Sequence, residues 1–169
     1  DGLTGRDVAP GQAGSGAKRP GRGFVSGDSF AGEGSAASAS PLLDRAMCFA
    51  ANNGLVAVSV SYRLAPAATW PAGARDVAAA LSWVYQNADL FGGNAQEIIP
   101  IGYGTGAFHL ASFLAHKEFQ EKDDFVAGAV LLSGLYQPTA DAGEAARAYF
   151  GADASSYDSR SAIKGLTQI

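Results

Sequence analysis

The spacing of apolar positions changes along the chain and predicts alternating helices and strands. After Pro41, apolar residues recur three and four positions apart, as on one face of a helix, and Asn53-Gly54 is a typical stop signal. Residues 55–62 form a valine-rich run that predicts a buried strand. Helical spacing returns over residues 72–88. This part of the chain therefore predicts a helix, a strand and a second helix, in that order.

The pattern continues toward the carboxyl end. Residues 97–101 predict a short strand, residues 102–106 a glycine-rich turn, and residues 107–116 a helix. Residues 126–133 predict a third buried strand, and residues 142–150 a weak helix. Because strands alternate with helices, the chain is expected to be an α/β protein built from parallel βαβ units. Near-continuous apolar strands agree, since helices cover both faces of such a sheet.

The first forty residues have a different composition. Gly, Ala and Ser dominate residues 1–40, and only Gly23-Phe24-Val25 offers apolar anchoring. Such a composition is typical of flexible arms and loops. We therefore expect an irregular N-terminal segment over residues 1–40 and an α/β core over residues 41–169.

Composition and charge exclude several partners. The formal net charge is −4, and no stripe of Lys and Arg interleaves with aromatic residues, so a nucleic-acid partner is not expected. No apolar run approaches the roughly 18 residues of a membrane helix, so we expect no membrane association. The polar start of the chain lacks the pattern of a signal peptide, which makes a cytoplasmic location the default.

The single cysteine and the two histidines offer little metal or redox chemistry. Cys48 excludes an internal disulfide, and its apolar neighbours predict a buried thiol. His109 and His116 share one face of a predicted helix, where we expect one half-buried and one surface histidine. They lack the additional carboxylate or cysteine ligands that a zinc site needs. We therefore expect neither a metal nor a cofactor.

Several segments of the chain, taken in order, carry a family resemblance. They are Gly23-Phe24-Val25-Ser26-Gly27-Asp28, Tyr62-Arg63-Leu64-Ala65-Pro66, Trp70-Pro71-Ala72-Gly73, Phe91-Gly92-Gly93-Asn94 and Gly102-Tyr103-Gly104-Thr105-Gly106-Ala107. At this spacing they resemble the α/β-hydrolase superfamily, in the carboxylesterase branch that includes hormone-sensitive-lipase-like and arylformamidase (kynurenine formamidase-like) enzymes. The resemblance implies a parallel sheet flanked by helices. It also implies hydrolysis of a small-molecule ester or amide through an acyl-enzyme.

The turn at residues 102–106 departs from the family pattern at its central position. In the family, a G-x-S-x-G turn carries the nucleophilic serine on a sharp strand-to-helix elbow. Here Gly104 stands at the serine position, between the elbow glycines Gly102 and Gly106. Thr105 takes the place of the residue whose backbone N–H serves the oxyanion hole. Because glycine cannot attack an acyl carbon, the resemblance predicts a catalytically silent chain, a pseudoenzyme or a fragment.

Three other parts of the family pattern are altered. The family's His-Gly-Gly-Gly run aligns with Pro20-Gly21-Arg22-Gly23, which makes Gly21 and Arg22 the candidates for the rest of the oxyanion hole. Residues 11–19 have little strand propensity, so we expect the sheet to lack a central strand between residues 55–62 and 97–101. No histidine follows residue 133, so the C-terminal strands with the triad acid and base are expected to be missing too.

Three alternatives stay open on the sequence. The chain could be an active carboxylesterase or arylformamidase whose remaining triad residues lie outside it. Thr105 could act as a displaced nucleophile, although triad geometry must hold to a fraction of an ångström. Finally, Gly102-x-Gly104-x-x-Ala107 fits a loose dinucleotide fingerprint, which would make the chain a nucleotide-binding module. That reading needs an acidic residue at the end of the next strand, which instead ends Leu131-Leu132-Ser133-Gly134.

Overall fold

The core of the molecule is a mostly parallel sheet. The computed structural model describes residues 8–9, 19–27, 30, 41–120, 126–139, 141 and 143–167. Five strands follow the order β1-β3-β2-β4-β5. They are β1 (Val8–Ala9), β2 (Arg19–Gly27), β3 (Val56–Val60), β4 (Gly93–Gly104) and β5 (Val130–Leu132). Strands β3, β2, β4 and β5 run parallel, and β1 pairs with β3 in the antiparallel sense. The α/β class predicted from the sequence is confirmed.

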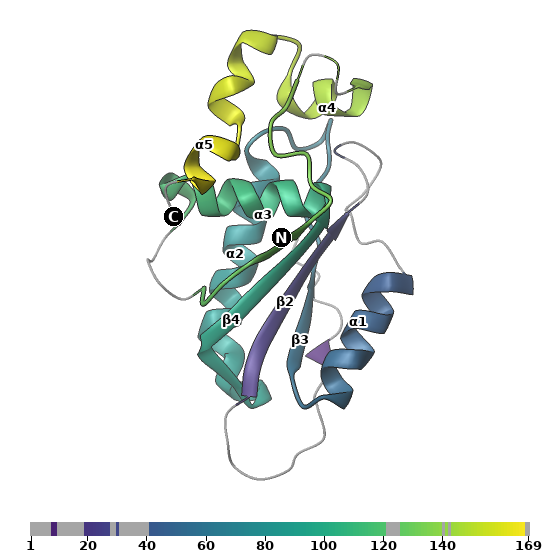
Figure 1. The fold of residues 1–169 in the computed structure, drawn as a ribbon, viewed down its shortest axis with the longest axis vertical. Coiled ribbons are helices and arrows are strands. Elements are labelled where there is room, and N and C mark those ends of the chain that lie inside the picture. Colours follow the sequence, from purple (N-terminus) through teal and green to yellow (C-terminus); the bar gives the residue numbers. More distant parts are fainter. Residues whose placement is uncertain are drawn as a thin grey trace.

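Helices lie on both faces of the sheet and beyond its carboxyl end (Figure 1). The α-helices are α1 (Pro41–Asn52), α2 (Ala72–Asn87), α3 (Thr105–Ala115), α4 (Gly143–Phe150) and α5 (Ile163–Leu166). Four short 3₁₀ helices span Ala88–Phe91, Lys117–Phe119, Ala154–Ser156 and Asp158–Arg160. The parallel strands run toward the end of the molecule where α4 lies (Figure 1).

The sequence of β3 is apolar almost throughout, and the packing on its two faces explains this. Val58 and Val60 belong to the core that β3 shares with α2 and α3, whereas Ala57 packs with Met47 and Ala50 of α1. Side chains alternate between the faces of a strand, so a strand covered on both faces needs apolar residues at successive positions. The two helices on opposite faces thus account for the valine-rich run.

The expectation of a missing central strand is wrong. Strand β2 lies between β3 and β4 and pairs with both in parallel, with Gly23 opposite Val58 on one side and Pro100 on the other. Strand propensity depends on context more than helix propensity does. Two parallel strands present unpaired N–H and C=O groups to the gap between them, and a glycine-rich backbone satisfies them as well as any other. Of the run 11–19, only Arg19 belongs to the described residues, and it begins β2.

The boundary at residue 40 is also not a boundary of the fold. Strands β1 and β2 both come from the first forty residues, so this part of the expected irregular segment belongs to the sheet. The two strands predicted later in the chain overlap strands of the structure. The strand expected at 97–101 is the centre of β4. The strand expected at 126–133 contains β5 and an isolated bridge between Val126 and Ile98, but its expected burial is wrong, because β5 lies at the edge of the sheet with Val130 and Leu132 exposed.

Helix α1 corrects the expectation for the cysteine. Met47 and Ala50 face the sheet, whereas Cys48 and Phe49 are exposed. Successive helical residues point about 100° apart, so neighbours of a sheet-facing residue turn toward solvent. Apolar neighbours in sequence therefore did not imply burial. Among the described residues, no helix combines the length and the apolar character needed to cross a membrane.

Candidate functional site

The candidate site is the turn from β4 into α3. The predicted change from strand to helix within residues 102–106 is confirmed, although both elements extend further into that segment than expected: strand β4 ends at Gly104 and helix α3 begins at Thr105. Gly104 has φ 57° and ψ −127°, a conformation that residues with a Cβ adopt only under strain. Figure 1 shows the end of β4 meeting the start of α3 at the carboxyl end of the sheet. This sharp turn is the geometry in which an elbow presents its central residue.

Gly102 makes the close approach of strand and helix possible. A Cβ on Gly102 would lie 2.6 Å from Cα and 2.9 Å from N of Ala107, both backbone atoms of the first turn of α3. Gly106 is buried in the same turn. The two elbow glycines thus lie where the turn brings the helix onto the strand.

Thr105 is held by a neighbouring strand end. Its Oγ1 lies 2.6 Å from the hydroxyl of Tyr62, within a hydrogen bond in which either group can be the donor. Tyr62 follows β3 and is buried. The bond fixes the first residue of α3 to the end of β3. The threonine hydroxyl is therefore engaged with the protein at the elbow.

Gly21 and Arg22 do not join Gly104, so their assignment to the oxyanion hole is corrected. The register of β2 places them opposite Ile98 and Ile99, whereas Gly27 lies opposite Gly104. At about 3.3 Å per residue, Gly21 is about 20 Å from the level of the elbow along the strand. Because β2 runs beside β4 to the same end of the sheet, only its last residues come level with the turn.

His109 lies inside the molecule, not on its surface. Only 1% of the residue is exposed, and its ring centroid is 4.2 Å from that of Tyr62 and 5.2 Å from that of Tyr149. Burial lowers the pKa of His109 to about 3, so the imidazole is neutral at neutral pH. The expectation of one surface histidine was wrong, because α3 is covered by the sheet on one side and by α4 and its neighbouring segments on another.

His116 is the half-buried histidine of the pair. Its Nδ1 lies 3.4 Å from Oε1 of Glu118, and its ring packs against Trp70 and Phe119. It sits at the far end of α3 from the elbow. In the part of the chain that the structure describes, no three His, Cys, Asp or Glu residues gather as a metal site would require.

Comparison with known proteins decides the family. Residues 21–139, well over half of the chain, match the family model described as BD-FAE. The chain belongs to the BD-FAE family of α/β-hydrolase esterases. The esterase LipQ of Mycobacterium tuberculosis is 31% identical over 141 residues, which are 79% of this chain and 31% of LipQ. The probable carboxylic ester hydrolase LipM of the same organism is 34% identical over 101 residues, covering 55% of this chain and 23% of LipM.

Solved esterases share the fold of this BD-FAE member. The hyperthermophilic esterase from Pyrobaculum calidifontis matches 80% of this chain and 46% of its own, with a TM-score of 0.60 and 26% identity. Esterase 2 of Thermogutta terrifontis matches 89% of this chain and 59% of its own, with a TM-score of 0.65 and 21% identity. The chain thus spans less than a third of LipQ and about half of each of these two structures. The family match includes the glycine-rich turn at residues 102–106.

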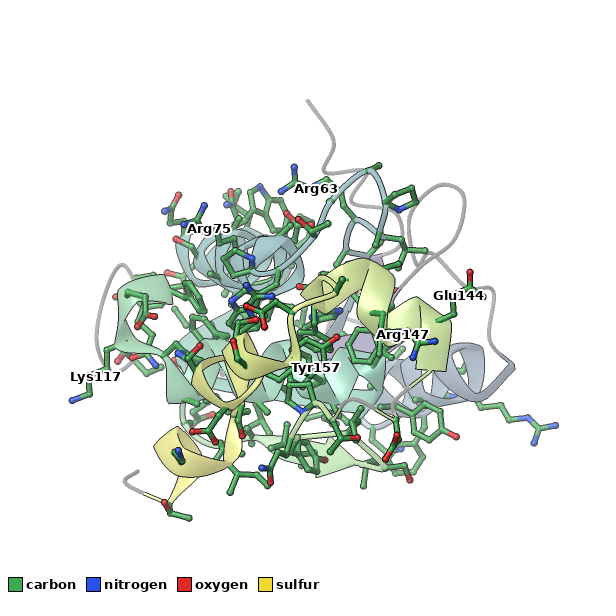
Figure 2. The ribbon with its side chains drawn as sticks, turned by 90° about the horizontal axis from the view of Figure 1, so that it is seen from above. Arg63, Arg75, Lys117, Glu144, Arg147 and Tyr157 are labelled. Carbon is green, nitrogen blue, oxygen red and sulfur yellow. The ribbon has the colours of Figure 1, made fainter. Side chains whose placement is uncertain are left out.

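A mainly aromatic cluster covers α3, the elbow helix of this BD-FAE member, on the side of α4. Its buried members are Phe30, Ala65, Phe108, Ala146, Tyr149, Phe150 and Tyr157, with Trp70 against them. Seen from above, Tyr157 lies over the middle of the molecule, whereas Glu144 and Arg147 of α4 lie to one side (Figure 2). Sequence reasoning missed this cluster. The adjacent Tyr149 and Phe150 at the end of a weak helix were its only signal.

One ion pair ties the end of β3 to α2. Arg63 donates from Nη2 to Oδ1 of Asp76 at 2.7 Å, and its backbone N–H donates to Oδ2 at 2.9 Å. The hydrogen bond to Asp76 raises the pKa of the Arg63 guanidinium. Arg63 lies at the outer edge of the molecule (Figure 2). The pair fixes the segment that carries Tyr62, and so helps to position the elbow.

Proposed function

We propose that this chain is a BD-FAE family member that does not hydrolyse esters. The observation that carries the proposal is Gly104 at the apex of the β4–α3 turn, with φ 57° and ψ −127°. An esterase of this superfamily attacks its substrate with a serine at that position. A glycine there leaves the turn intact and removes the attacking oxygen.

The neighbouring side chains do not replace the missing nucleophile. The hydroxyl of Thr105 forms a hydrogen bond with the hydroxyl of Tyr62. His109, five residues after the elbow glycine, is enclosed by aromatic rings and cannot reach solvent at the turn. His116 follows the last residue of α3, about 16 Å along the helix axis from its start. Neither histidine of the chain is therefore placed to act as a base at residue 104.

Membership of an esterase family supports a proposal for the chemistry of the ligand. A small-molecule carboxylic ester or arylformamide is the class that we propose for the site, bound without cleavage. Ligands of open α/β sheets bind beyond the carboxyl ends of the strands, which is where Gly104 lies. We further propose that the protein works in the cytoplasm without a nucleic-acid or membrane partner. The rival proposal is an active carboxylesterase or arylformamidase completed by residues outside this chain.

Covalent trapping tests the proposal. An organophosphonate transfers its phosphorus group to an activated serine or threonine, and intact-mass measurement detects the added mass. We expect no adduct on the wild-type chain under conditions in which a commercial carboxylesterase is fully modified. A stoichiometric adduct on Thr105, located by peptide sequencing, would show that the threonine is an activated nucleophile and would overturn the proposal.

The Gly104→Ser variant tests whether a base within this chain serves the elbow. A serine hydroxyl without a general base is a weak nucleophile at neutral pH, so we expect this variant also to remain unmodified and inactive. The matched control is Gly128→Ser, which places the same side chain at an exposed glycine with no atom near its Cβ. Rapid modification of Ser at position 104, but not at 128, would show that a base serves the elbow. In that case the chain lacks only the nucleophile, and the part of the proposal that leaves the elbow without a base is wrong.

A further inference from the structure

His109 lies where five segments of the molecule meet. It belongs to α3, and its ring packs against Tyr62 after β3, Tyr149 of α4 and Phe30, with centroid distances of 4.2, 5.2 and 5.7 Å. Gly73 at the start of α2 closes the remaining side. The imidazole thus stands between the elbow helix and the elements that cover it.

The space around the ring leaves no room for a counter-ion. A Cβ on Gly73 would lie 2.5 Å from both Nδ1 and Cε1 of His109, so the ring touches the backbone of α2. Nδ1 is buried and has no hydrogen-bond partner among the described residues. A protonated imidazole donates from both nitrogens. Protonation in this position would therefore bury a charge beside Nδ1 without an acceptor.

Helix α4 depends on the same packing. The backbone N–H of Gly73 donates to the hydroxyl of Tyr149 at 3.1 Å, and the N–H of Trp70 donates to the carbonyl of Tyr149 at 3.0 Å. Ala146, Tyr149 and Phe150 are buried, whereas Glu144 and Arg147 are exposed. This eight-residue helix contacts the body through Tyr149, whose ring packs against His109, and through Phe150, whose ring packs against Phe30, Phe108 and Tyr157.

The titratable groups near His109 do not compensate a charge at Nδ1. The hydroxyl of Tyr62 forms a hydrogen bond with that of Thr105. Burial raises the pKa of Tyr149, so its hydroxyl stays neutral. Asp76 on α2 is paired with Arg63. Along α3 itself, His116 faces Glu118 at the opposite end of the helix.

We propose that His109 is an acid-sensitive latch for α4: protonation of its imidazole releases residues 143–150 from the elbow helix. In the closed form, burial holds the pKa of His109 near 3, whereas an exposed histidine has the ordinary value of 6.5. The open form therefore binds the proton and the closed form does not. Below pH 6.5, each unit by which the pH falls raises the ratio of open to closed molecules about tenfold, until the pH reaches the pKa of His109 in the closed form. Above pH 6.5 the latch stays closed.

Hydrogen exchange followed by mass spectrometry tests the latch. The wild-type chain is measured between pH 7.5 and pH 4.5, with each rate corrected for the intrinsic pH dependence of amide exchange. We expect peptides covering 143–150 to exchange about tenfold faster per pH unit below 6.5, while peptides covering 105–115 keep their protection. The His109→Gln variant is neutral at every pH and should lose the dependence. The His116→Gln variant should retain it, as a matched change on the same helix.

Three results would overturn the latch. The first is wild-type exchange of 143–150 that does not depend on pH. The second is a pH dependence that survives in His109→Gln. The third is joint loss of protection in 143–150 and 105–115, which would be global acid unfolding. His109→Phe, which keeps an aromatic ring in the cage, replaces the Gln variant if that variant does not fold. The wild-type profile alone decides between release of α4 and no release.

Discussion

Gly102→Ala is expected to lower the free energy of unfolding by about 3 kcal/mol or more. The new Cβ would lie 2.6 Å from Cα of Ala107 and 3.0 Å from the carbonyl oxygen of Gly106. Both atoms belong to backbone, and neither can move without shifting α3 away from β4. Overpacking in a close-packed core costs about 1–3 kcal/mol when side chains can adjust, and here the obstacle is the main chain.

Urea denaturation followed by circular dichroism measures this effect. The matched control is Gly128→Ala, since a Cβ on that exposed glycine meets nothing within 4 Å. We expect the control to stay within about 0.5 kcal/mol of the wild type. Equal stability of the two variants would mean that α3 does not pack onto β4 at the elbow as described.

Phe108→Ala is expected to destabilise the fold by about 3–5 kcal/mol, the range for truncating a buried phenylalanine. Phe108 is fully buried, and its ring lies 5.4 Å from that of Phe30 and 5.1 Å from that of Phe150, both in edge-on geometry. Truncation removes the ring contacts to Phe30, Trp70 and Phe150 together.

Phe49 provides the control for this second prediction. It is 64% exposed on α1, so Phe49→Ala removes the same atoms from a surface position. We expect a change of less than about 1 kcal/mol in the same urea titration. A loss for Phe108→Ala no larger than for Phe49→Ala would contradict the packing of α3 beneath the aromatic cluster.

Local patterns predicted the elements that tertiary context does not oppose. The strand-to-helix turn at Gly104 could be read from the sequence, because glycines at alternate positions meet a steric need that only glycine fills. The valine-rich run of β3 and the helical spacing of α2 likewise follow directly from burial on one or both faces. In each case the residue type and its environment agree.

Features set by distant contacts could not be predicted in this way. Strand β2 has a glycine-rich sequence and owes its conformation to β3 and β4 on either side. Its register with β4 places Gly21 and Arg22 opposite Ile98 and Ile99, away from the elbow. The burial of His109 depends on Gly73 and Tyr149, which come from α2 and α4. No spacing within residues 107–116 carries that information.

Hydrolysis of a short p-nitrophenyl ester tests the central claim most directly. The purified chain should release p-nitrophenol no faster than a heat-denatured sample at the same concentration. Hydrolases without their triad can retain roughly 10³–10⁴-fold acceleration through an intact oxyanion hole and binding site. Here the nucleophile is absent at Gly104, and neither Gly21 nor Arg22 lies at the elbow. We therefore expect no measurable rate, and Thr105→Ala should match the wild type. A burst of p-nitrophenol from the wild-type chain that Thr105→Ala abolishes would contradict the account and identify the threonine as the nucleophile.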